Sequence, residues 1–477
     1  MAAHLDSRSH RNAGPARRLL RTLAVLAVVT VLALVALAWF RVGEPEVRLE
    51  ASKPGIGRTG SPVTVHLSEP SRGLAEVEVE VLQKGREPAV VAKKTYTPRR
   101  PFWAFWGPRT TSDTLQMKIG KDTVPGLVEG QATIRAVARR PGTPLREGAP
   151  VVAEIELPVR LRPPLISVVS TQNYVRQGGS GVVVYRVGAS ALAEGGRDGV
   201  RSGDDFFPGY PLPGGEAGER FAFFAAPWNL DDPSKIRLVA EDPIGNRAEA
   251  AFVDEWFPHP PRRDTIHLSD DFMHKAVSEI LSQTPELQDK GDLLQNYLQI
   301  NGELRREEAH ELRELGAASK PEFLWNGAFV ALPGAAVMSH FADQRTYLYQ
   351  GRAVDHQTHL GYDLASVRQA EVPAANRGIV VLAHYFGIYG NAVVIDHGYG
   401  LMSLYGHLSS IAVKEGQEVE RGQILGHTGA TGLAGGDHLH FTLMIRGEPV
   451  TPVEWWDGKW IRDRIASKLG KALPYQP

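Results

Sequence analysis

The most apolar stretch of the chain lies near its N-terminus, where residues 22–40 (TLAVLAVVTVLALVALAWF) contain no charged side chain. As a helix this stretch reaches about 28 Å, roughly the hydrocarbon thickness of a bilayer. Only Arg41 follows it closely, whereas the basic residues before it are Arg8, Arg11, Arg17, Arg18 and Arg21. The asymmetry predicts a cytoplasmic basic tail over 1–21, a transmembrane signal-anchor over 22–40 and export of the rest.

A cleaved signal peptide is the alternative interpretation of this segment. Ala36–Ala38 (ALA) resembles a cleavage site. The apolar core of a signal peptide is usually about 7–15 residues long, however, and this stretch is longer. We therefore favour the anchor.

Polar and apolar residues alternate in the next part of the chain. Between residues 44 and 165, runs such as VTVHL, AEVEVEVL and ATIRAVA are separated by Gly, Pro and basic turns. Side chains two positions apart share one face of a strand, so this pattern predicts a β-sandwich-like domain. Residues 166–258 continue with GVVVYRVG and with two strand-like runs around DPIGN, which predicts a second β domain.

The pattern changes at the proline-rich sequence WFPHPPRR (256–263). Beyond it, Ser269 or Asp270 can cap the helix DFMHKAVSEILSQ, and NGELRREEAHELRELG carries charge pairs at helical spacing. Residues 259–335 are thus predicted to be a helical linker region. Strand-like runs return over 336–457, which predicts a third, separate β domain, and an amphipathic tail follows over 458–477. The expected fold class is mainly β and multidomain.

Composition narrows the chemistry that the chain can perform. The 477 residues carry a formal net charge of −1, so composition gives no support for binding nucleic acid. The chain has no cysteine, which excludes disulfides, thiolate nucleophiles and cysteine-ligated metals. Any metal ion must be held by His, Asp or Glu.

Two short histidine-containing sequences are candidates for such a site. His438 and His440 in GGDHLHF lie two residues apart, so in a strand both imidazoles point to one face. His359 and Asp363 in HLGYDLA flank a glycine, which indicates a turn leading into a strand. Together with one histidine of the pair they would supply three ligands and leave the fourth position open, as in a catalytic zinc site.

His267 and Asp271 have the same spacing as His359 and Asp363, but they lie where a helix is expected to begin. Aspartate is common there because it caps the helix and faces the positive end of its dipole. The sequence therefore favours a capping role over a metal-binding role for this second pair.

Several motifs follow one another over about 120 residues: HLGYD, VIDHGYGLMSLYGHLS, GQILGHTGATGLAGGDHLHF and GEPVTP. In this order they resemble the successive signatures of the lysostaphin/LytM-type zinc metallo-endopeptidases. By that resemblance His359, Asp363 and His440 match the ligands of Zn2+, and His438 and His407 match two catalytic histidines. The segments NGELR and LWNGAF also look like sequences that precede this domain in membrane-anchored bacterial relatives.

The resemblance implies a LytM-type antiparallel β domain with an open groove. It also implies a peptidoglycan peptide as substrate, with the chain anchored in the inner membrane and most of it periplasmic or extracytoplasmic. In the implied mechanism zinc activates a water molecule, His438 acts as general base, and His407 orients or stabilises the tetrahedral oxyanion.

Two other functions stay open at this point. Some LytM-like domains lose their metal ligands and activate cell-wall amidases instead, but all five site residues are present here. A zinc peptidase acting on proteins or Gly-rich peptides would need the same five residues. We also hypothesise that the helices of 259–335, or the β domains, partly cover the groove and restrict the enzyme.

Other residues receive a structural interpretation. His384, His397 and His427 are expected to be surface or hydrogen-bonded residues, and Tyr405 to be a packing residue. His356 lies near His359 without being a predicted ligand. The tryptophan-rich sequence PFWAFWGP (101–108) has two equal interpretations, a membrane or glycan contact and a loop over the first β domain.

Overall fold

The computed structural model describes residues 15–40, 44–97, 107–260 and 262–475. Part of the basic tail and most of the tryptophan-rich sequence at 101–108 lie outside the described residues. Contacts within the chain define two compact units: Met1–Arg162 with Pro243–Asn246, and Pro163–Asp242 with Arg247–Pro477.

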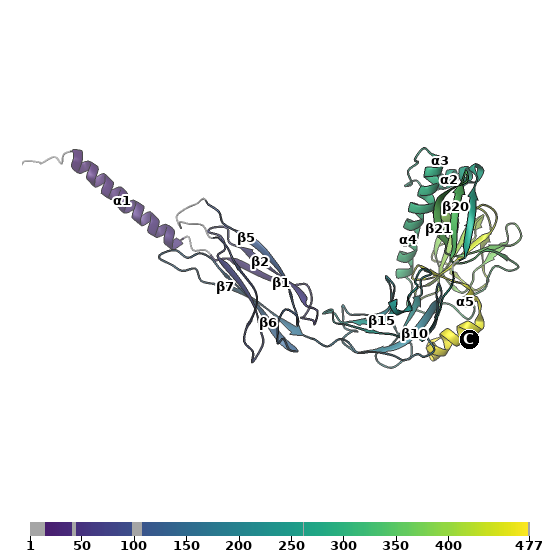
Figure 1. The fold of residues 1–477 in the computed structure, drawn as a ribbon, viewed down its shortest axis with the longest axis horizontal. Coiled ribbons are helices and arrows are strands. Elements are labelled where there is room, and N and C mark those ends of the chain that lie inside the picture. The colour runs from purple at the N-terminus through teal and green to yellow at the C-terminus, as the bar shows by residue number, and fades with distance from the viewer. Residues whose placement is uncertain (1–14, 41–43, 98–106, 261, 476–477) are drawn as a thin grey trace, which may run out of the picture. The chain divides into compact units, whose positions relative to one another are not determined.

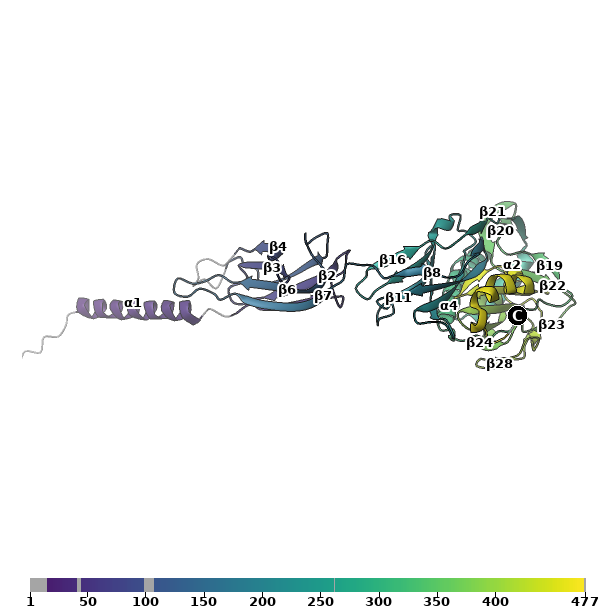
Figure 2. The same ribbon diagram turned by 90° about the horizontal axis from the view of Figure 1, so that it is seen from below.

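The first unit contains the apolar helix and one β domain (Figures 1 and 2). Helix α1 spans Pro15–Phe40 and is long and apolar enough, by length and composition, to cross a membrane. The domain pairs a sheet of order β1-β2-β5 with one of order β4-β3-β6-β7. Its strands are β1 (Glu46–Ala51), β2 (Ser61–Ser68), β3 (Glu76–Leu82), β4 (Ala89–Thr95), β5 (Ser112–Ile119), β6 (Gly130–Arg139) and β7 (Val151–Val159).

Alternation explains the core of this first β domain. In β3 the valines are buried and the glutamates between them are partly exposed. Ile134 of β6 is fully buried in the same apolar cluster. A strand with one apolar face packs that face against the other sheet and leaves the opposite face to solvent.

The second unit begins with two four-stranded sheets, of order β13-β14-β10-β8 and β12-β11-β15-β16, and a short parallel pair, β17 and β9. The mainly β fold expected from the sequence is confirmed. The strands are β8 (Ile166–Val168), β9 (Tyr174–Arg176), β10 (Ser180–Val187), β11 (Arg197–Ser202), β12 (Asp205–Pro208), β13 (Tyr210–Pro211), β14 (Glu219–Ala225), β15 (Ile236–Glu241), β16 (Arg247–Ala250) and β17 (Glu255–Phe257).

A helical segment follows, which we define as residues 263–317. It comprises β18 (Arg263–Leu268), α2 (Asp270–Gln283), α3 (Leu293–Gln299), the π-helical turn η2 (Ile300–Leu304) and α4 (Arg305–Ala317). Ser269 caps α2 by accepting the N–H of Phe272 at 3.2 Å, and Asp271 lies in the first turn of that helix. The helices lie beside β20 (Asp343–Tyr349) and β21 (Arg352–His359) in Figure 1.

This segment is part of the second unit, whereas the sequence pattern predicts a linker. Strand β18 pairs in parallel with β20, from Arg263 opposite Gln344 onward. The buried face of α2, with Met273 and Ile280, belongs to one apolar cluster with Tyr347 and Ile388. The apolar stripe at i, i+3, i+4 and i+7 of α2 therefore packs against the neighbouring β domain.

The last β domain is built on a sheet of order β19-β22-β30-β26-β25-β24-β28, with β31 beside β30 and a small sheet β23-β29-β27. Strands β26 and β30 are buried at every position. The remaining strands are β19 (Ala336–Ser339), β22 (Tyr362–Ala365), β23 (Glu371–Pro373), β24 (Gly378–Tyr385), β25 (Asn391–Asp396), β26 (Leu401–Leu408), β27 (Ser410–Ile411), β28 (Glu418–Val419), β29 (Ile424–His427), β30 (Leu439–Ile445) and β31 (Glu448–Val450).

The C-terminal residues also belong to this unit. They form α5 (Val453–Trp456), α6 (Gly458–Trp460), η4 (Ile461–Ala466), α7 (Ser467–Leu469) and η5 (Gly470–Ala472). Trp455 is fully buried, with its ring centroid 6.1 Å from that of Phe223 in β14. Lys468 donates to the carbonyl oxygen of Val182 at 3.0 Å. Strands β10 and β14, the last β domain and the C-terminal helices thus share one apolar core, although the sequence pattern separates them.

Candidate metal centre

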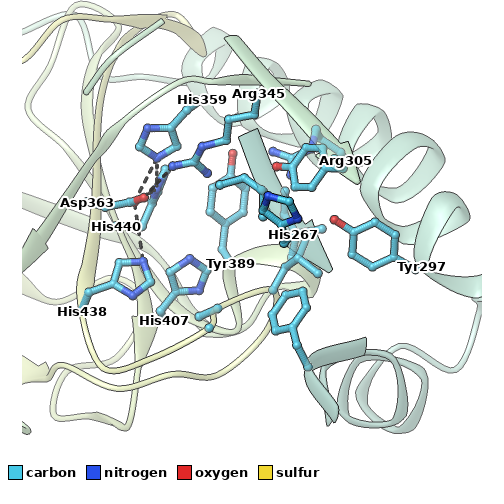
Figure 3. Close-up of a pocket in the computed structure, with 17 residues that line it drawn as sticks. His267, Tyr297, Arg305, Arg345, His359, Asp363, Tyr389, His407, His438 and His440 are labelled. Carbon is cyan, nitrogen blue, oxygen red and sulfur yellow. Dashed lines mark hydrogen bonds and ion pairs between the residues drawn. The ribbon is translucent and has the colours of Figure 1, made fainter. Parts of the chain in front are cut away.

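Three neighbouring strands bring the predicted site residues together. The sheet order β22-β30-β26 places Asp363 directly opposite His440, and His440 opposite Gly406. His359 ends β21, His438 comes just before β30, and His407 lies near the end of β26. Figure 3 shows all five predicted side chains directed toward one cavity.

His359, Asp363 and His440, which we call the donor triad, lie close enough to share one ion. The Nε2 atom of His359 is 2.9 Å from Asp363 Oδ1 and 3.1 Å from His440 Nδ1. His440 Nδ1 is 3.0 Å from the same carboxylate oxygen. Neighbouring ligands of a tetrahedral zinc ion are separated by about 3.3 Å, as follows from metal–ligand bonds of about 2.0–2.1 Å. Within the described part of the chain, the donor triad is the one group of His, Asp or Glu side chains that meets this kind of geometry.

Hydrogen bonds on the outer side of the donor triad set which nitrogen carries the proton. His359 Nδ1 donates to the carbonyl oxygen of His340 at 3.0 Å, which leaves the Nε2 lone pair facing the site. Thr442 Oγ1 donates to the Leu360 carbonyl at 3.0 Å, so it accepts from His440 Nε2 at 2.9 Å. The His440 Nδ1 lone pair then faces the site as well.

A hydrogen bond on its outer side also orients the carboxylate of Asp363. Arg345 Nη2 donates to Asp363 Oδ2 at 2.9 Å and leaves Oδ1 for the donor triad. Burial alone would raise the pKa of Asp363, but the charge of His359 and contacts with the other imidazoles hold that pKa well below its ordinary value. When both imidazoles are neutral, two nitrogen lone pairs and one carboxylate oxygen converge, and a cation at their centre offsets their mutual repulsion. A zinc ion fits this donor set.

Gly361 permits this close approach. A Cβ atom at this position would lie 2.6 Å from both Cε1 and Nε2 of the His440 ring. Any other residue would therefore push apart the turn between β21 and β22, which positions His359 and Asp363.

His407 and His438 flank the donor triad, with their ring centroids 4.8 Å apart. His407 Nδ1 donates to the Thr431 carbonyl at 2.9 Å, and His438 Nδ1 donates to the Gly436 carbonyl at 2.8 Å. His438 Nε2 lies 3.6 Å from Asp363 Oδ1. His407 has a backbone φ of 64°, an unfavourable value for a residue with a side chain, as is often seen at functional sites.

Comparison with known proteins agrees with this geometry. Residues 357–452 match the model of peptidase family M23. We refer to residues 357–452 as the M23 domain.

The chain is similar to parts of several curated proteins. It is 39% identical over 118 residues to the peptidoglycan DD-endopeptidase ShyA of Vibrio cholerae, covering 25% of this chain and 27% of that protein. It is 41% identical over 95 residues to the DD-carboxypeptidase/endopeptidase Mpg of Neisseria meningitidis, covering 20% of this chain and 22% of Mpg. It is also 37% identical over 95 residues to the murein hydrolase activator EnvC of Escherichia coli, covering 20% of this chain and 23% of EnvC. The chain thus spans about a quarter of the length of these relatives.

The M23 domain shares its site cavity with the helical segment. The cavity has a volume of about 390 Å³ and is lined by all five predicted site residues. Residues outside the matched region also line it, namely Ile266, His267, Phe272, Tyr297, Arg305, Arg345 and Tyr347. The helical segment is therefore a wall of the cavity, as the hypothesis of a partial cover requires.

Arg345 and Arg305 line the cavity of the M23 domain but were missed by sequence reasoning. Arg345 lies in a strand where polar and apolar residues alternate, and Arg305 lies among the charges of a predicted exposed helix. Neither position has a spacing that distinguishes it from surface arginines. His267 also faces the cavity in Figure 3, although its partner in the sequence pattern, Asp271, is in the first turn of α2.

The remaining histidines of the M23 region have structural roles. His397 is fully buried and bridges the Arg377 carbonyl, at 2.7 Å, and Ser403 Oγ, at 2.8 Å. His384 pairs with Glu415, and His427 contacts Ser410 Oγ. His356 is exposed and contacts Thr346 rather than the donor triad. Tyr405 is buried, and its hydroxyl accepts the N–H of Ala375 at 2.7 Å.

Proposed function

We propose that this chain is a zinc-dependent endopeptidase that hydrolyses peptide bonds in the stems or cross-links of bacterial peptidoglycan. The M23 match and the likeness to proteins named as DD-endopeptidases support a peptidase of this substrate class. Helix α1 would anchor the chain in the inner membrane, and the excess of arginines before it would keep the bulk of the chain on the periplasmic side.

The single observation that carries this proposal is the convergence of three lone-pair donors in one cavity. His359 Nε2, Asp363 Oδ1 and His440 Nδ1 would hold the metal ion, and a cavity adjoins them in which a peptide can be placed. When bound, zinc supplies a Lewis acid that polarises the scissile carbonyl and lowers the pKa of the attacking water.

His438 is the residue that we assign to proton transfer. Its Nδ1–H is held by the Gly436 carbonyl, so the lone pair of the neutral ring, on Nε2, faces the cavity. Burial lowers the pKa of His438, but the hydrogen bond and charge of Asp363 outweigh burial and raise it. His438 can thus take a proton from the attacking water and deliver it to the leaving amine.

His407 has a related geometry but a different electrostatic setting. Its Nδ1–H is held by Thr431, so Nε2 of the neutral ring also presents a lone pair. Burial, followed by the charges of His438 and His440, lowers the pKa of His407 well below its ordinary value. A neutral His407 can orient water through Nε2. It can stabilise an oxyanion only after the reaction has placed a proton on Nε2.

The likeness to EnvC raises activation of another murein hydrolase as a second candidate function. An activator needs a surface that fits its partner, and nothing in that role requires three lone pairs to converge. A peptidase for proteins or Gly-rich peptides would use the same five residues, so it differs from the main proposal only in the substrate.

Digestion of isolated peptidoglycan tests the proposal. The zinc-loaded protein is expected to release muropeptides whose masses identify a hydrolysed peptide bond, and His438→Ala is expected to release them about 10²- to 10⁴-fold more slowly. If no wall product forms but the protein stimulates a purified murein amidase, and His438→Ala stimulates it equally well, the activator function is correct. Cleavage of a Gly-rich peptide without cleavage of the wall would instead favour the third function.

A further inference from the structure

Arg305 is a cation held in a fixed position at the cavity of the M23 domain. It is the first residue of α4 and follows the π-helical turn η2. Its Nε donates to the backbone carbonyl of Asn301 at 3.1 Å, and its Nη2 donates to the side-chain oxygen of Asn301 at 2.6 Å. Asn301 is fully buried and donates its own amide to Asp355 at 2.7 Å. A buried amide thus orients the guanidinium from one side.

The opposite edge of this guanidinium has no protein partner among the described residues. The contacts of Arg305 use Nε and Nη2, and Nη1 takes part in neither of them. Arg305 lines the site cavity together with the donor triad, and it also lines two adjoining hollows. In Figure 3 its side chain extends to the same cavity as that of Arg345.

The carboxylates around the cavity do not neutralise Arg305. Asp363 is the one carboxylate that lines the cavity, and it is bonded to Arg345 and belongs to the donor triad. Glu308 lies one turn beyond Arg305, but burial raises the pKa of its carboxyl to about 8, so it is mostly protonated at neutral pH. Among the described residues Arg305 is therefore an oriented cation without an ion pair, and an anionic group of a ligand would be a natural partner.

We propose that Arg305 binds a free carboxylate of the substrate peptide and makes the enzyme specific for stems that carry one. The inference rests on the proposed function. The substrate class is a cross-linked stem peptide with a free carboxylate that reaches the part of the cavity lined by Arg305. The guanidinium offers Nη1 to this carboxylate, while Asn301 keeps the guanidinium in place.

The test compares two soluble cross-linked muropeptides that differ only in whether this carboxylate is free or amidated. With the zinc-loaded full chain, Arg305→Ala is expected to raise KM for the free carboxylate about 10- to 100-fold, the size of a lost charge-assisted hydrogen bond. The same variant should change kcat by less than about 3-fold and leave KM for the amidated peptide unchanged. Arg306→Ala is the matched control, because Arg306 is an exposed neighbour that does not line the cavity.

Two further variants test whether the effect of Arg305→Ala comes from lost binding of the substrate carboxylate or from a disturbed fold. Asn301→Ala should raise KM for the free carboxylate less than Arg305→Ala does, and Arg305→Lys should restore part of the discrimination. Affinities of zinc-loaded His438→Ala for the two peptides, measured by calorimetry, give the same comparison without turnover. Equal affinity for the two peptides, or an equal loss on both in the Arg305→Ala background, would overturn the inference. If wild type cleaves neither peptide but binds the free carboxylate more tightly, the proposed function fails and the role of Arg305 stands.

Discussion

The first β domain and the M23 domain are both built from antiparallel strands, but they bury different kinds of side chain. In β3 of the first domain, buried valines alternate with partly exposed glutamates. In β26 and β30 of the M23 domain every position is buried, and the buried residues include Ser403, His407, His440 and Thr442. Burying a polar group is unfavourable unless it is hydrogen-bonded or binds a ligand.

The difference between the two domains indicates which buried residues of a β protein belong to a functional site. The apolar core of the first β domain follows from alternation, and its burial stabilises the fold. In the M23 domain the same sheet geometry places imidazoles where apolar side chains would pack better, and their outer nitrogens are all hydrogen-bonded to the protein. Polar residues that are buried and oriented in this way mark a site of chemistry.

The sharpest way to test this contrast is to remove the proton-transfer residue. His438→Ala should lower kcat for muropeptide hydrolysis by about 10²- to 10⁴-fold, because a positioned acid–base group is lost, and should leave zinc content unchanged. His407→Ala should lower kcat less. Steady-state kinetics with metal analysis checks both, and His384→Ala, at an exposed site, is the control. A larger effect at His407 would reverse the two assignments.

A core substitution in the first β domain should lower the stability of that domain and leave catalysis unchanged. Ile134→Ala removes a fully buried side chain and should lower the free energy of unfolding of that domain by about 2–5 kcal/mol. Zinc content and hydrolysis of a small muropeptide should not change. Chemical denaturation followed by domain-specific fluorescence measures the first effect. Loss of zinc in this variant would show that the two regions are not separable.

A buried carboxyl in the second unit makes the stability of that unit depend on pH. Burial raises the pKa of Glu308 to about 8, from an ordinary value of 4.5. The folded state therefore holds a proton that the unfolded state releases, so this contribution to stability falls as pH rises from about 4.5 to about 8. Glu308→Gln should flatten the dependence of melting temperature on pH in this window. An unchanged slope would mean that Glu308 ionises normally.

The smallest expected effect concerns the contact between α2 and the M23 domain. Lys275 donates to the carbonyl oxygens of Ala430 and Ala434, and Glu279 accepts the N–H of Gly432 at 2.7 Å. This loop includes Thr431, which holds His407. Losing a hydrogen bond costs about 1 kcal/mol, and part of this cost reaches His407 through Thr431, so Lys275→Ala with Glu279→Ala should lower kcat about 5- to 10-fold.

His274→Ala, an exposed change in the same helix, is the control for that pair of substitutions. A rise in activity on whole peptidoglycan would instead support the hypothesis that the helical segment restricts access to the cavity. The two outcomes differ in sign, so one assay decides between them.

Different parts of the molecule were predictable from the sequence to different degrees. Alternation predicted the strands, and ordered motifs predicted the five residues that the structure brings to one cavity. Arg305 and Arg345 were not predictable, because a surface arginine and a site arginine have the same local pattern. The packing of α2 on the M23 domain was expected only as one of two alternatives, because an amphipathic helix shows that it has an apolar face but not which surface covers that face.

Removal and return of zinc tests whether a metal ion held by the donor triad is required for hydrolysis. The protein is depleted with a chelator, and peptidoglycan cleavage is followed while zinc is titrated back, beside Asp363→Ala. We expect cleavage to disappear on depletion, to return in full at one zinc per chain, and never to return in the variant. Cleavage that survives depletion, or an Asp363→Ala protein that recovers with zinc, would contradict this requirement.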